Sequence, residues 1–363
     1  MSRRTFFKVL LVAVAILGLL VLSDVLSAQG GKDAAFERVK EVQAKHTARL
    51  MKIKGVVGTA IGLDENNKLV VTVLTGKQGV AGIPKKLDDV TVQTVATGKF
   101  YALAPGGKPG KPGKPDKPGK PGNGKKINPK KRCDRPVPIG VSTGNEGECS
   151  SGTIGCRVKD ADGKVYALSN NHVYALENNA PIGSRVLQPG RYDAKPQCAI
   201  KSKDVIGTLA AFEPIVFSTT ANNTIDAAIA VSSTGNLGNA TPSNGYGKPK
   251  SVPVAAAVDQ TVQKYGRTTS LTKGTVTLIN ATINVNYGTE ANPKYARFVD
   301  QVLIAPSTFS AAGDSGSLVV TDPDKNPVGL LFAGGYLNGV LQVTVANPIG
   351  PVLDAFGVTI DGE

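Results

Sequence analysis

The sequence predicts an all-β domain over residues 136–363, preceded by a small α+β unit. The chain of 363 residues contains 42 glycines and 23 prolines, a content typical of turn-rich β proteins. From residue 136 onward, short apolar runs alternate with turns rich in Gly, Asn, Pro and Asp, without a βαβ rhythm. The one candidate helix in this region is 349–356. About 228 residues of this kind favour a two-barrel or sandwich architecture.

Residues 1–28 have the composition of an export signal. A charged start that contains Arg3 and Arg4 is followed by the apolar run 9–22 and by two small residues. The segment Ser2–Lys8 resembles the twin-arginine export motif, which predicts a prokaryotic protein that is secreted, periplasmic or held at the cell surface. Two alternatives stay open: an ordinary secretory signal, and an uncleaved anchor, for which the apolar run is short.

Residues 33–103 are expected to form the small α+β unit. Apolar residues at helical spacing predict an amphipathic helix at its start. Residues 56–63 and 69–74 have the pattern of two strands joined by a polar turn. Residues 90–95 predict a third strand, which 100–103 extends.

Residues 104–132 are a low-complexity segment of Gly, Lys and Pro. Between residues 104 and 135 there are eleven Lys or Arg residues and two Asp residues, so this stretch carries most of the net charge of +14. The rest of the chain is close to neutral, which argues against a nucleic-acid partner. The Gly-X-Y triplets are too few for a collagen helix, so we expect an extended, self-repelling linker. Its charge also suits contact with an anionic cell surface.

The chain has four cysteines, Cys133, Cys149, Cys156 and Cys198. An even number of cysteines in an exported chain predicts up to two disulfides. Four cysteines allow three pairings, and the sequence does not choose among them.

Three residues of the β domain have the types that serine-based catalysis requires. Ser315 lies between glycines, where the backbone turns tightly and presents the hydroxyl. The hydroxyl needs a base, and His172 is the sole histidine of the domain. The base needs an acid, and Asp226 heads an apolar run, where a buried carboxylate requires a partner. Asp193 and Asp204 stand in more polar surroundings and fit that role less well.

The stretches Ser-Asn-Asn-His, Thr-Ile-Asp-Ala-Ala-Ile-Ala and Gly-Asp-Ser-Gly-Ser, in this order, resemble motifs of the chymotrypsin/trypsin-like serine peptidases. The resemblance covers residues 141–358. It points to a divergent, bacterial-type branch, because Asn170 and Asn171 precede His172 and no cysteine follows it. It implies two antiparallel Greek-key β-barrels with one site between them, and a secreted endopeptidase that hydrolyses peptide bonds through an acyl-enzyme.

The same resemblance assigns roles to the three residues. Ser315 is the nucleophile, His172 takes and returns the proton, and Asp226 orients the histidine. The N–H groups of Gly313 and Ser315 form the oxyanion hole. No cofactor and no metal are implied, since zinc-type Cys/His pairs are missing from the sequence and the acidic turn 322–326 lacks the later residues of an EF-hand loop.

The resemblance also predicts where a polypeptide substrate binds. Phe332, Ala333, Gly334 and Gly335 match the strand that pairs with the substrate backbone. Phe309, six residues before the nucleophile, lies at the base of the primary specificity pocket. A phenylalanine there offers no charge for a basic side chain and favours an apolar or small one.

Asp314 and the N-terminal unit raise the question of activation. In many family members this aspartate pairs with a new N-terminus released by zymogen cleavage. No suitable Ile-Val-Gly-Gly start follows the linker here, so Asp314 is expected to have another partner. The α+β unit is interpreted as a pro-segment that covers the site or assists folding, with a separate adhesive module as the alternative.

Two other functions are open at this stage. A non-catalytic surface-binding protein could use the same scaffold, because fold does not guarantee function. An esterase could use the same three residues on a different substrate. The sequence decides neither the substrate nor the oligomeric state.

Overall fold

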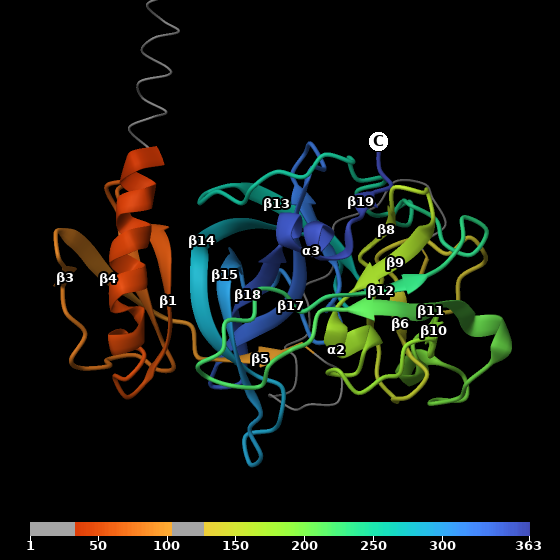
Figure 1. The fold of residues 1–363 in the computed structure, drawn as a ribbon, viewed down its shortest axis with the longest axis horizontal. Helices are drawn as coiled ribbons and strands as arrows, with labels where there is room; N and C mark the ends of the chain where they lie inside the picture. Colours follow the sequence, from red (N-terminus) through yellow and green to blue (C-terminus); the bar gives the residue numbers. More distant parts are fainter. Residues whose placement is uncertain (1–32, 104–126) are drawn as a thin grey trace, which may run out of the picture.

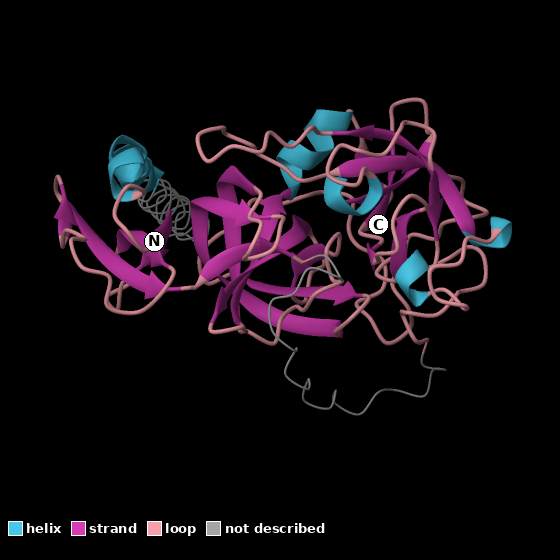
Figure 2. Cartoon of the chain, turned by 90° about the horizontal axis from the view of Figure 1, so that it is seen from below, coloured by secondary structure: helices cyan, strands magenta, loops and turns pink. Residues whose placement is uncertain are grey.

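The computed structural model describes residues 33–103 and 127–363. These residues form three bodies in a row, with the N-terminal unit at one end and the two β-barrels following it (Figures 1 and 2). Within the described ranges no helix is both long and apolar enough to cross a membrane. The predicted export signal, residues 1–28, lies outside the described residues.

The second barrel, at the centre of Figure 1, is built from six antiparallel strands. They pair in the order β13-β16-β17-β18-β15-β14, and β14 pairs again with β13, which closes the ring. Buried Val, Ile, Leu and Phe side chains fill it. The strands are β13 (Thr261–Gly266), β14 (Ser270–Asn286), β15 (Tyr295–Ala305), β16 (Leu318–Thr321), β17 (Pro327–Leu337) and β18 (Val340–Pro348).

The first barrel is an eight-stranded sheet in the order β19-β8-β9-β12-β11-β10-β6-β7. Only two residues separate β7, at one end of the sheet, from β8, the second strand from the other end, so the chain itself brings the two ends together. The strands are β6 (Ser142–Asn145), β7 (Gly152–Thr153), β8 (Cys156–Lys159), β9 (Val165–Ser169), β10 (Arg185–Leu187), β11 (Val205–Phe212), β12 (Ala228–Val231) and β19 (Thr359–Ile360). The predicted all-β fold with two antiparallel barrels is thus confirmed.

Short helices occupy the connections of the barrels. They are α2 (Asn171–Tyr174), η1 (Arg191–Asp193), η2 (Ser202–Asp204) and α3 (Ile349–Phe356). The helix predicted at 349–356 is therefore present. It ends at Gly357, whose φ of 60° lets its N–H turn back onto the carbonyls of the last turn.

The N-terminal unit packs one helix, over residues 33–50, on a small sheet. The helix buries Val39, Val42 and Leu50 against β1 and β2. The sheet contains β1 (Val56–Leu63), β2 (Leu69–Thr75), β3 (Lys86–Leu87) and β4 (Val90–Ala96). Strand β1 also pairs with β14, so the sheet of this unit continues into the second barrel.

Strand β5 (Lys99–Ala102) departs from the prediction. It was expected to extend the third strand of the N-terminal unit, but it pairs antiparallel with β17 and parallel with β14. The chain turns away at Gly98, which has a φ of +73°. A Cβ atom at that position would overlap the carbonyl group of Tyr336, so only glycine fits this crossing without displacement.

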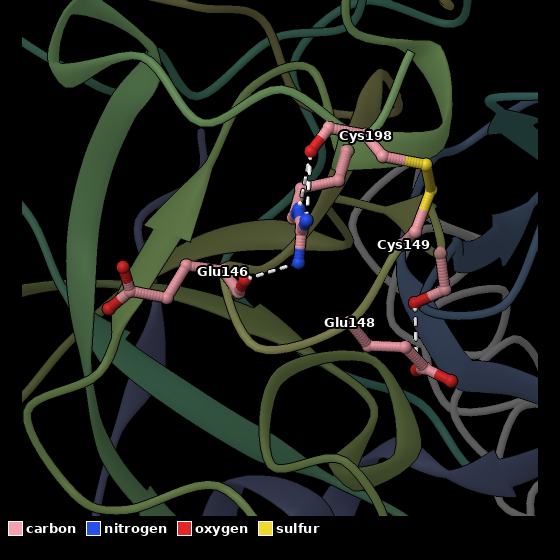
Figure 3. The surroundings of a disulfide bond; sticks show 6 residues. Glu146, Glu148, Cys149 and Cys198 are labelled. Atoms are coloured by element: carbon pink, nitrogen blue, oxygen red, sulfur yellow. Dashed lines mark hydrogen bonds between the residues drawn. A yellow bond between two sulfur atoms is a disulfide. The ribbon is translucent and has the colours of Figure 1, made fainter.

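One disulfide joins Cys149 to Cys198. Cys133 and Cys156 are free and buried. The guanidinium of Arg191 donates to the carbonyl oxygens of Cys198 and Glu146, which ties the two sides of the bridge together (Figure 3). Burial raises the pKa of both free thiols, which keeps them protonated.

The predicted linker, residues 104–132, is described only from residue 127. Its last six residues lie against the first barrel rather than free of it. The Arg132 guanidinium donates to Asp204 Oδ1 at 3.0 Å, and the amide of Ser142 donates to the carbonyl of Pro129 at 2.8 Å. The folded body therefore begins before residue 136.

Candidate active site

His172 and Asp226 meet at the edge of the first barrel. Strand β9 ends at Ser169, and the single turn α2 then presents His172 to the carboxylate that precedes β12. The His172 Nδ1 and Asp226 Oδ2 atoms are 2.6 Å apart, and the backbone N–H of His172 donates to Asp226 Oδ1 at 3.1 Å. Both side chains are buried. The two contacts fix the ring so that Nε2 points away from the carboxylate.

The backbone of Asp226 is held by amide side chains from both barrels. The Asn170 side chain donates to its carbonyl oxygen at 2.7 Å. The Asp226 N–H donates to Asn347 Oδ1 at 3.0 Å, and the Asn347 amide in turn donates to Gln301. Asn347 lies on β18, so the second barrel helps to place the carboxylate of the first.

Tyr287 is a site residue that the sequence did not indicate. Its hydroxyl donates to Asp226 Oδ2 at 2.7 Å, so this oxygen accepts from both the tyrosine and the histidine. Burial first, and then the charge of Asp226, raise the pKa of Tyr287 well above its ordinary value, which keeps the hydroxyl a donor. Tyr287 follows β14, and no spacing rule links it to Asp226, 61 residues away.

Opposing effects act on the protonation of His172. Burial by itself lowers the pKa of the imidazole, but the charge and hydrogen bond of Asp226 outweigh it, so the pKa lies above its ordinary value of 6.5. The Nε2 atom is buried and has no hydrogen-bond partner among the described residues. A nitrogen without a hydrogen-bond partner is available to accept a proton, as a general base requires, and no hydrogen bond joins it to Ser315 Oγ among the described residues.

Ser315 lies in the loop between β15 and β16 and contacts the first barrel directly. Its carbonyl accepts from the N–H of Thr153 at 2.7 Å. The carbonyl of Thr153 accepts in turn from Ser169 Oγ at 2.8 Å, three residues before His172. The Ser315 Oγ atom lies 3.4 Å from the carbonyl oxygen of Phe332 on β17. The loop that carries Ser315 is thus fastened beside the strand that leads to His172.

The predicted oxyanion-hole and substrate positions are adjacent to this serine. Gly313 has a φ of +94°, and its N–H donates to the carbonyl of Leu103 at 2.8 Å. The N–H of Leu103 donates to the carbonyl of Phe332 at 3.0 Å. Ala333, Gly334 and Gly335 pair with residues 100–102 of β5. The strand predicted to hold a substrate backbone is therefore occupied by the chain's own segment.

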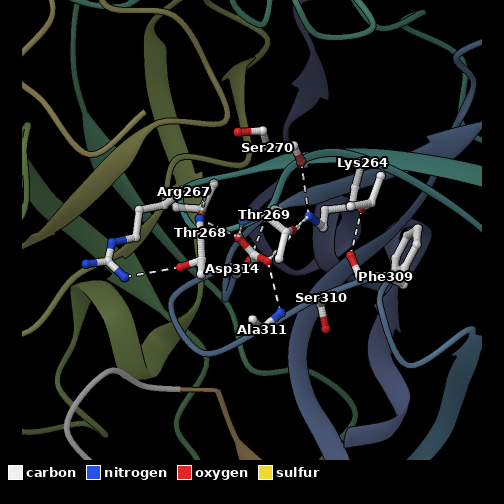
Figure 4. Close-up of polar contacts among 12 residues, drawn as sticks. Lys264, Arg267, Thr268, Thr269, Ser270, Phe309, Ser310, Ala311 and Asp314 are labelled. Carbon is white, nitrogen blue, oxygen red and sulfur yellow. Dashed lines mark hydrogen bonds and ion pairs between the residues drawn. The ribbon is translucent and has the colours of Figure 1, made fainter. Parts of the chain in front are cut away.

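The sequence predicted that Asp314 has a partner other than a newly released N-terminus, and in the structure that partner is Lys264. Its carboxylate lies 3.3 Å from Lys264 Nζ, and both side chains are fully buried (Figure 4). It also accepts from Thr268 N, Thr269 Oγ1 and Ala311 N, at 2.7, 2.7 and 3.0 Å. Burial lowers the pKa of Lys264, and the nearby charge of Asp314 opposes that shift. The sequence did not indicate Lys264, which lies in an ordinary strand pattern on β13.

Phe309 is fully buried close to this ion pair. The Lys264 ammonium lies 5.9 Å from the centre of its ring. The ring belongs to the apolar cluster of the second barrel, which also contains Leu103. Phe309 thus presents an apolar surface in the region where the sequence predicted the pocket.

The two alternative acids are engaged elsewhere. Asp193 Oδ1 lies 2.5 Å from the guanidinium of Arg267, in an ion pair that joins the two barrels. Asp204 is paired with Arg132 at 3.0 Å. Neither carboxylate contacts His172, so among the described acids Asp226 is the one bonded to the imidazole.

No protein-family model matches the chain. One curated relative, Glutamyl endopeptidase 2 of Streptomyces griseus, is 29% identical over 117 residues, which is 32% of this chain and 56% of that protein. The chain therefore spans little more than half the length of this relative.

The chain resembles the bacterial chymotrypsin-like serine peptidases. Among solved structures it is similar to a glutamic acid specific serine protease that uses a histidine triad in substrate binding, with 22% identity and a TM-score of 0.42. It is also similar to Thermobifida fusca Protease A (17%, 0.43) and to Nocardiopsis Protease (18%, 0.42). Each similarity covers 62% of this chain and 98–100% of the other.

Proposed function

We propose that the chain is an exported serine endopeptidase that uses His172, Asp226 and Ser315. The observation that carries the proposal is the buried 2.6 Å contact between His172 Nδ1 and Asp226 Oδ2, with Nε2 left free. The carbonyl of Ser315 accepts from Thr153, whose own carbonyl accepts from Ser169, three residues before His172. A nucleophile, an oriented base and backbone donors close together are the parts that acyl transfer requires.

The chemistry follows from these positions. Ser315 Oγ attacks the carbonyl carbon of a peptide bond while its proton passes to His172 Nε2. Asp226 stabilises the imidazolium that forms, and the N–H groups of Gly313 and Ser315 stabilise the oxyanion. The imidazolium then protonates the leaving amine. A water molecule hydrolyses the acyl-enzyme by the reverse proton route.

The loop that carries the donors needs no external activator in this proposal. Lys264 supplies an internal cation to Asp314, so the turn at residues 311–317 is braced within the second barrel. The peptidase is therefore competent without insertion of a newly cleaved N-terminus. In this proposal, zymogen control acts through the N-terminal unit.

The substrate is a polypeptide, and its preferred side chain is apolar. Glutamyl endopeptidase 2 is named for glutamate, and the similar glutamic-acid-specific protease uses three histidines in substrate binding. This chain has two histidines in total, and one is His172. The nearby cation, Lys264, is already paired with Asp314. No free positive charge is therefore offered to an acidic substrate side chain by these residues.

Replacement of the nucleophile is the direct test. Ser315→Ala should reduce peptide hydrolysis by about a million-fold, because the three residues act as a unit. His172→Ala should have a similar effect. The thermal melting of both variants should match that of the native protein, which separates lost chemistry from lost folding. Undiminished hydrolysis by both variants would remove the assignment.

Export and cell-surface contact are further parts of this proposal. They rest on the composition of residues 1–28 and 104–132, since most of those residues lie outside the described part of the chain. Sequencing the N-terminus of the protein recovered from the medium and from the cell envelope would test both.

A further inference from the structure

We propose that a four-residue cluster between the two barrels positions the catalytic base and its carboxylate. We name it the clamp, and its members are Glu177, Phe217, Tyr287 and Lys294. Tyr287 contacts the carboxylate of Asp226, and the other three members act through Tyr287. This inference rests on the proposed function and adds three positioning residues to it.

Tyr287 and Lys294 reach the clamp from the second barrel. Tyr287 directly follows β14 and Lys294 directly precedes β15, so both lie at the base of the hairpin that joins these strands. The N–H of Tyr287 donates to the carbonyl of Lys294 at 2.9 Å, which sets the two residues opposite each other. Opposed residues of an antiparallel pair have their side chains on one face. The second barrel therefore presents a phenol and an ammonium group together to the first barrel.

Lys294 makes two contacts with the first barrel. Its Nζ atom lies 2.7 Å from Glu177 Oε2 and 3.6 Å from the centre of the Phe217 ring. The face of an aromatic ring attracts an ammonium group, and this attraction adds to that of the carboxylate. The Lys294 side chain is 40% exposed, so water weakens the ion pair and the expected effect on the rate is moderate.

The ring of Phe217 connects these contacts to the site. Phe217 and Tyr287 meet edge to face, with ring centres 5.5 Å apart and planes at 83°. Tyr287 also meets the His172 ring edge to face, at 6.0 Å, while its hydroxyl donates to Asp226 Oδ2 at 2.7 Å. A rotation of the Tyr287 ring that lengthened this hydrogen bond would disturb both ring contacts. The clamp thus holds the hydroxyl on the carboxylate.

A turn in the left-handed region of backbone space presents Glu177. Residues 176–178 have φ values of 50°, 55° and 75°, and none of them is glycine. Such conformations cost free energy and persist where their surroundings impose them. The side chain of Asn171 donates to Asn178 Oδ1 at 2.7 Å and accepts from the Asn178 N–H at 3.1 Å, which imposes the turn. Asn171 adjoins His172, so the turn and the base share one anchor.

Asn178 also fastens the segment that leads to Phe217. Its Nδ2 atom donates to the carbonyl of Ile215 at 2.8 Å, and its Oδ1 atom accepts from the Ile215 N–H at 2.9 Å. Phe217 lies two residues further along the chain. The second asparagine of the Asn-Asn-His stretch, a departure from the motif that the stretch resembles, therefore supports the turn, this segment and the base together.

The clamp also carries charge near the imidazole. Burial lowers the pKa of His172, the carboxylate that it contacts raises it, and the charges of Glu177 and Glu148 raise it further. The hydroxyl of Tyr287, which packs on the imidazole, stays a neutral donor. Because Lys294 offsets the charge of Glu177, the state of this ion pair should change how strongly the imidazolium is stabilised.

The first experiment measures the pKa of His172 by NMR of the imidazole in the full chain. The chain has two histidines, so a His46→Gln background leaves the signal of His172 alone. Glu177→Gln removes a negative charge and should lower this pKa, whereas Lys294→Met leaves that charge unpaired and should raise it, each by roughly 0.3 pH unit or more. Lys273→Met, from an exposed ion pair of the same 2.7 Å length, is the matched control and should not shift it. Equal pKa values in all folded variants overturn the proposal.

The second experiment asks whether Lys294 acts through Tyr287. Lys294→Met should lower kcat for a peptide substrate by roughly three- to tenfold and leave KM within about twofold, because it removes positioning rather than substrate binding. In a Tyr287→Phe background, where the hydroxyl is absent, the same change should lower kcat by less than about twofold. Lys294→Arg keeps the charge and the ring contact, so it should retain most of the native kcat.

The outcomes separate the clamp from the proposed function. An equal loss of kcat from Lys294→Met in both backgrounds, or a raised KM with native kcat, overturns the clamp and leaves the peptidase standing. Hydrolysis undiminished by Ser315→Ala defeats the proposed function instead. The pKa of His172 in the clamp variants does not depend on hydrolysis, so it tests the electrostatic link in either case.

Discussion

At the residue scale, the carboxylate of Asp226 accepts hydrogen bonds from three groups of the candidate site. One oxygen accepts from His172 Nδ1 and from the hydroxyl of Tyr287, and the other accepts from a backbone N–H. A buried carboxylate with three donors has its negative charge stabilised where an imidazolium would form. The network also removes freedom from the His172 ring, which a general base in a crevice requires.

Tyr287→Phe should weaken catalysis without unfolding the protein. The change removes one charge-assisted hydrogen bond, worth about 1.5–3 kcal/mol, so we expect kcat/KM to fall by roughly ten- to a hundredfold. Peptide hydrolysis by the purified variant measures this. Tyr295→Phe is the control, because the Tyr295 hydroxyl makes no hydrogen bond with the residues that the structure describes. An equal loss in both variants would show that the effect is structural.

The elevated pKa of His172 predicts the acid limb of the pH profile. In the proposed mechanism His172 acts as the base when it is neutral. Its pKa is raised above 6.5, so kcat/KM should fall as the pH drops through a value higher than 6.5. In Asp226→Asn the raising partner is lost while burial remains, so the limb should move to lower pH with a much reduced plateau. Initial rates between pH 5 and about 9 would test this. If the acid limb of Asp226→Asn stays at the native pH, a group other than His172 is responsible for it.

At the element scale, the loop between β15 and β16 depends on a buried ion pair rather than on its own sequence. Asp314 accepts hydrogen bonds from within the loop and from the β13–β14 turn, and Lys264 of β13 neutralises it. Removing one partner of a buried pair leaves an uncompensated charge. The turn that offers Gly313 is therefore coupled to the stability of the second barrel.

Lys264→Met should destabilise the protein by about 3–5 kcal/mol and lower its activity. Urea denaturation measures the first effect and peptide hydrolysis the second. The exposed pair of Lys273 and Asp322, at 2.7 Å, supplies the control, since Lys273→Met should cost less than about 1 kcal/mol. If the double variant Lys264→Met/Asp314→Asn is no more stable than the single one, coupling between the two charges is refuted.

At the scale of the whole molecule, the two barrels are joined by more than the crevice. The Arg267–Asp193 pair crosses between them, and Asn347 of the second barrel accepts from the backbone of Asp226 in the first. The N-terminal unit then adds its sheet to the edge of β14. The candidate site is assembled where the two barrels meet, and strand β5 of the N-terminal unit lies along β17 beside it.

The disulfide should contribute to the global stability of the first barrel. Cys149 and Cys198 are separated by 49 positions, and closing a loop of that length stabilises a protein by about 4 kcal/mol in the chain-entropy treatment. Reductant should therefore lower the melting temperature of full-length Ser315→Ala, a background that excludes self-digestion. Adding Cys149→Ser and Cys198→Ser to that background should abolish the response. A response that persists would point to Cys133 or Cys156.

Local patterns were sufficient for much of the fold. Alternating apolar residues predicted β1, β2 and β4 nearly to their ends, and helical spacing predicted the first helix and α3. These elements are set by the periodicity of neighbouring residues, which the sequence displays directly. The same holds for the glycines around Ser315 and for the residue types chosen as His172 and Asp226, which the structure places in contact.

Contacts between residues far apart in the sequence were decided only by the tertiary structure. Strand β5 pairs with β17, more than 200 positions away, because β17 has an open edge in the cleft and Gly98 permits the crossing. Tyr287 and Lys264 reach their carboxylates only through the closure of the second barrel, and the pairing of Cys149 with Cys198 follows from the first. The sequence alone determined the strands, the turns and the reactive residue types. Long-range contacts then selected the partners, since no local period encodes which edges meet.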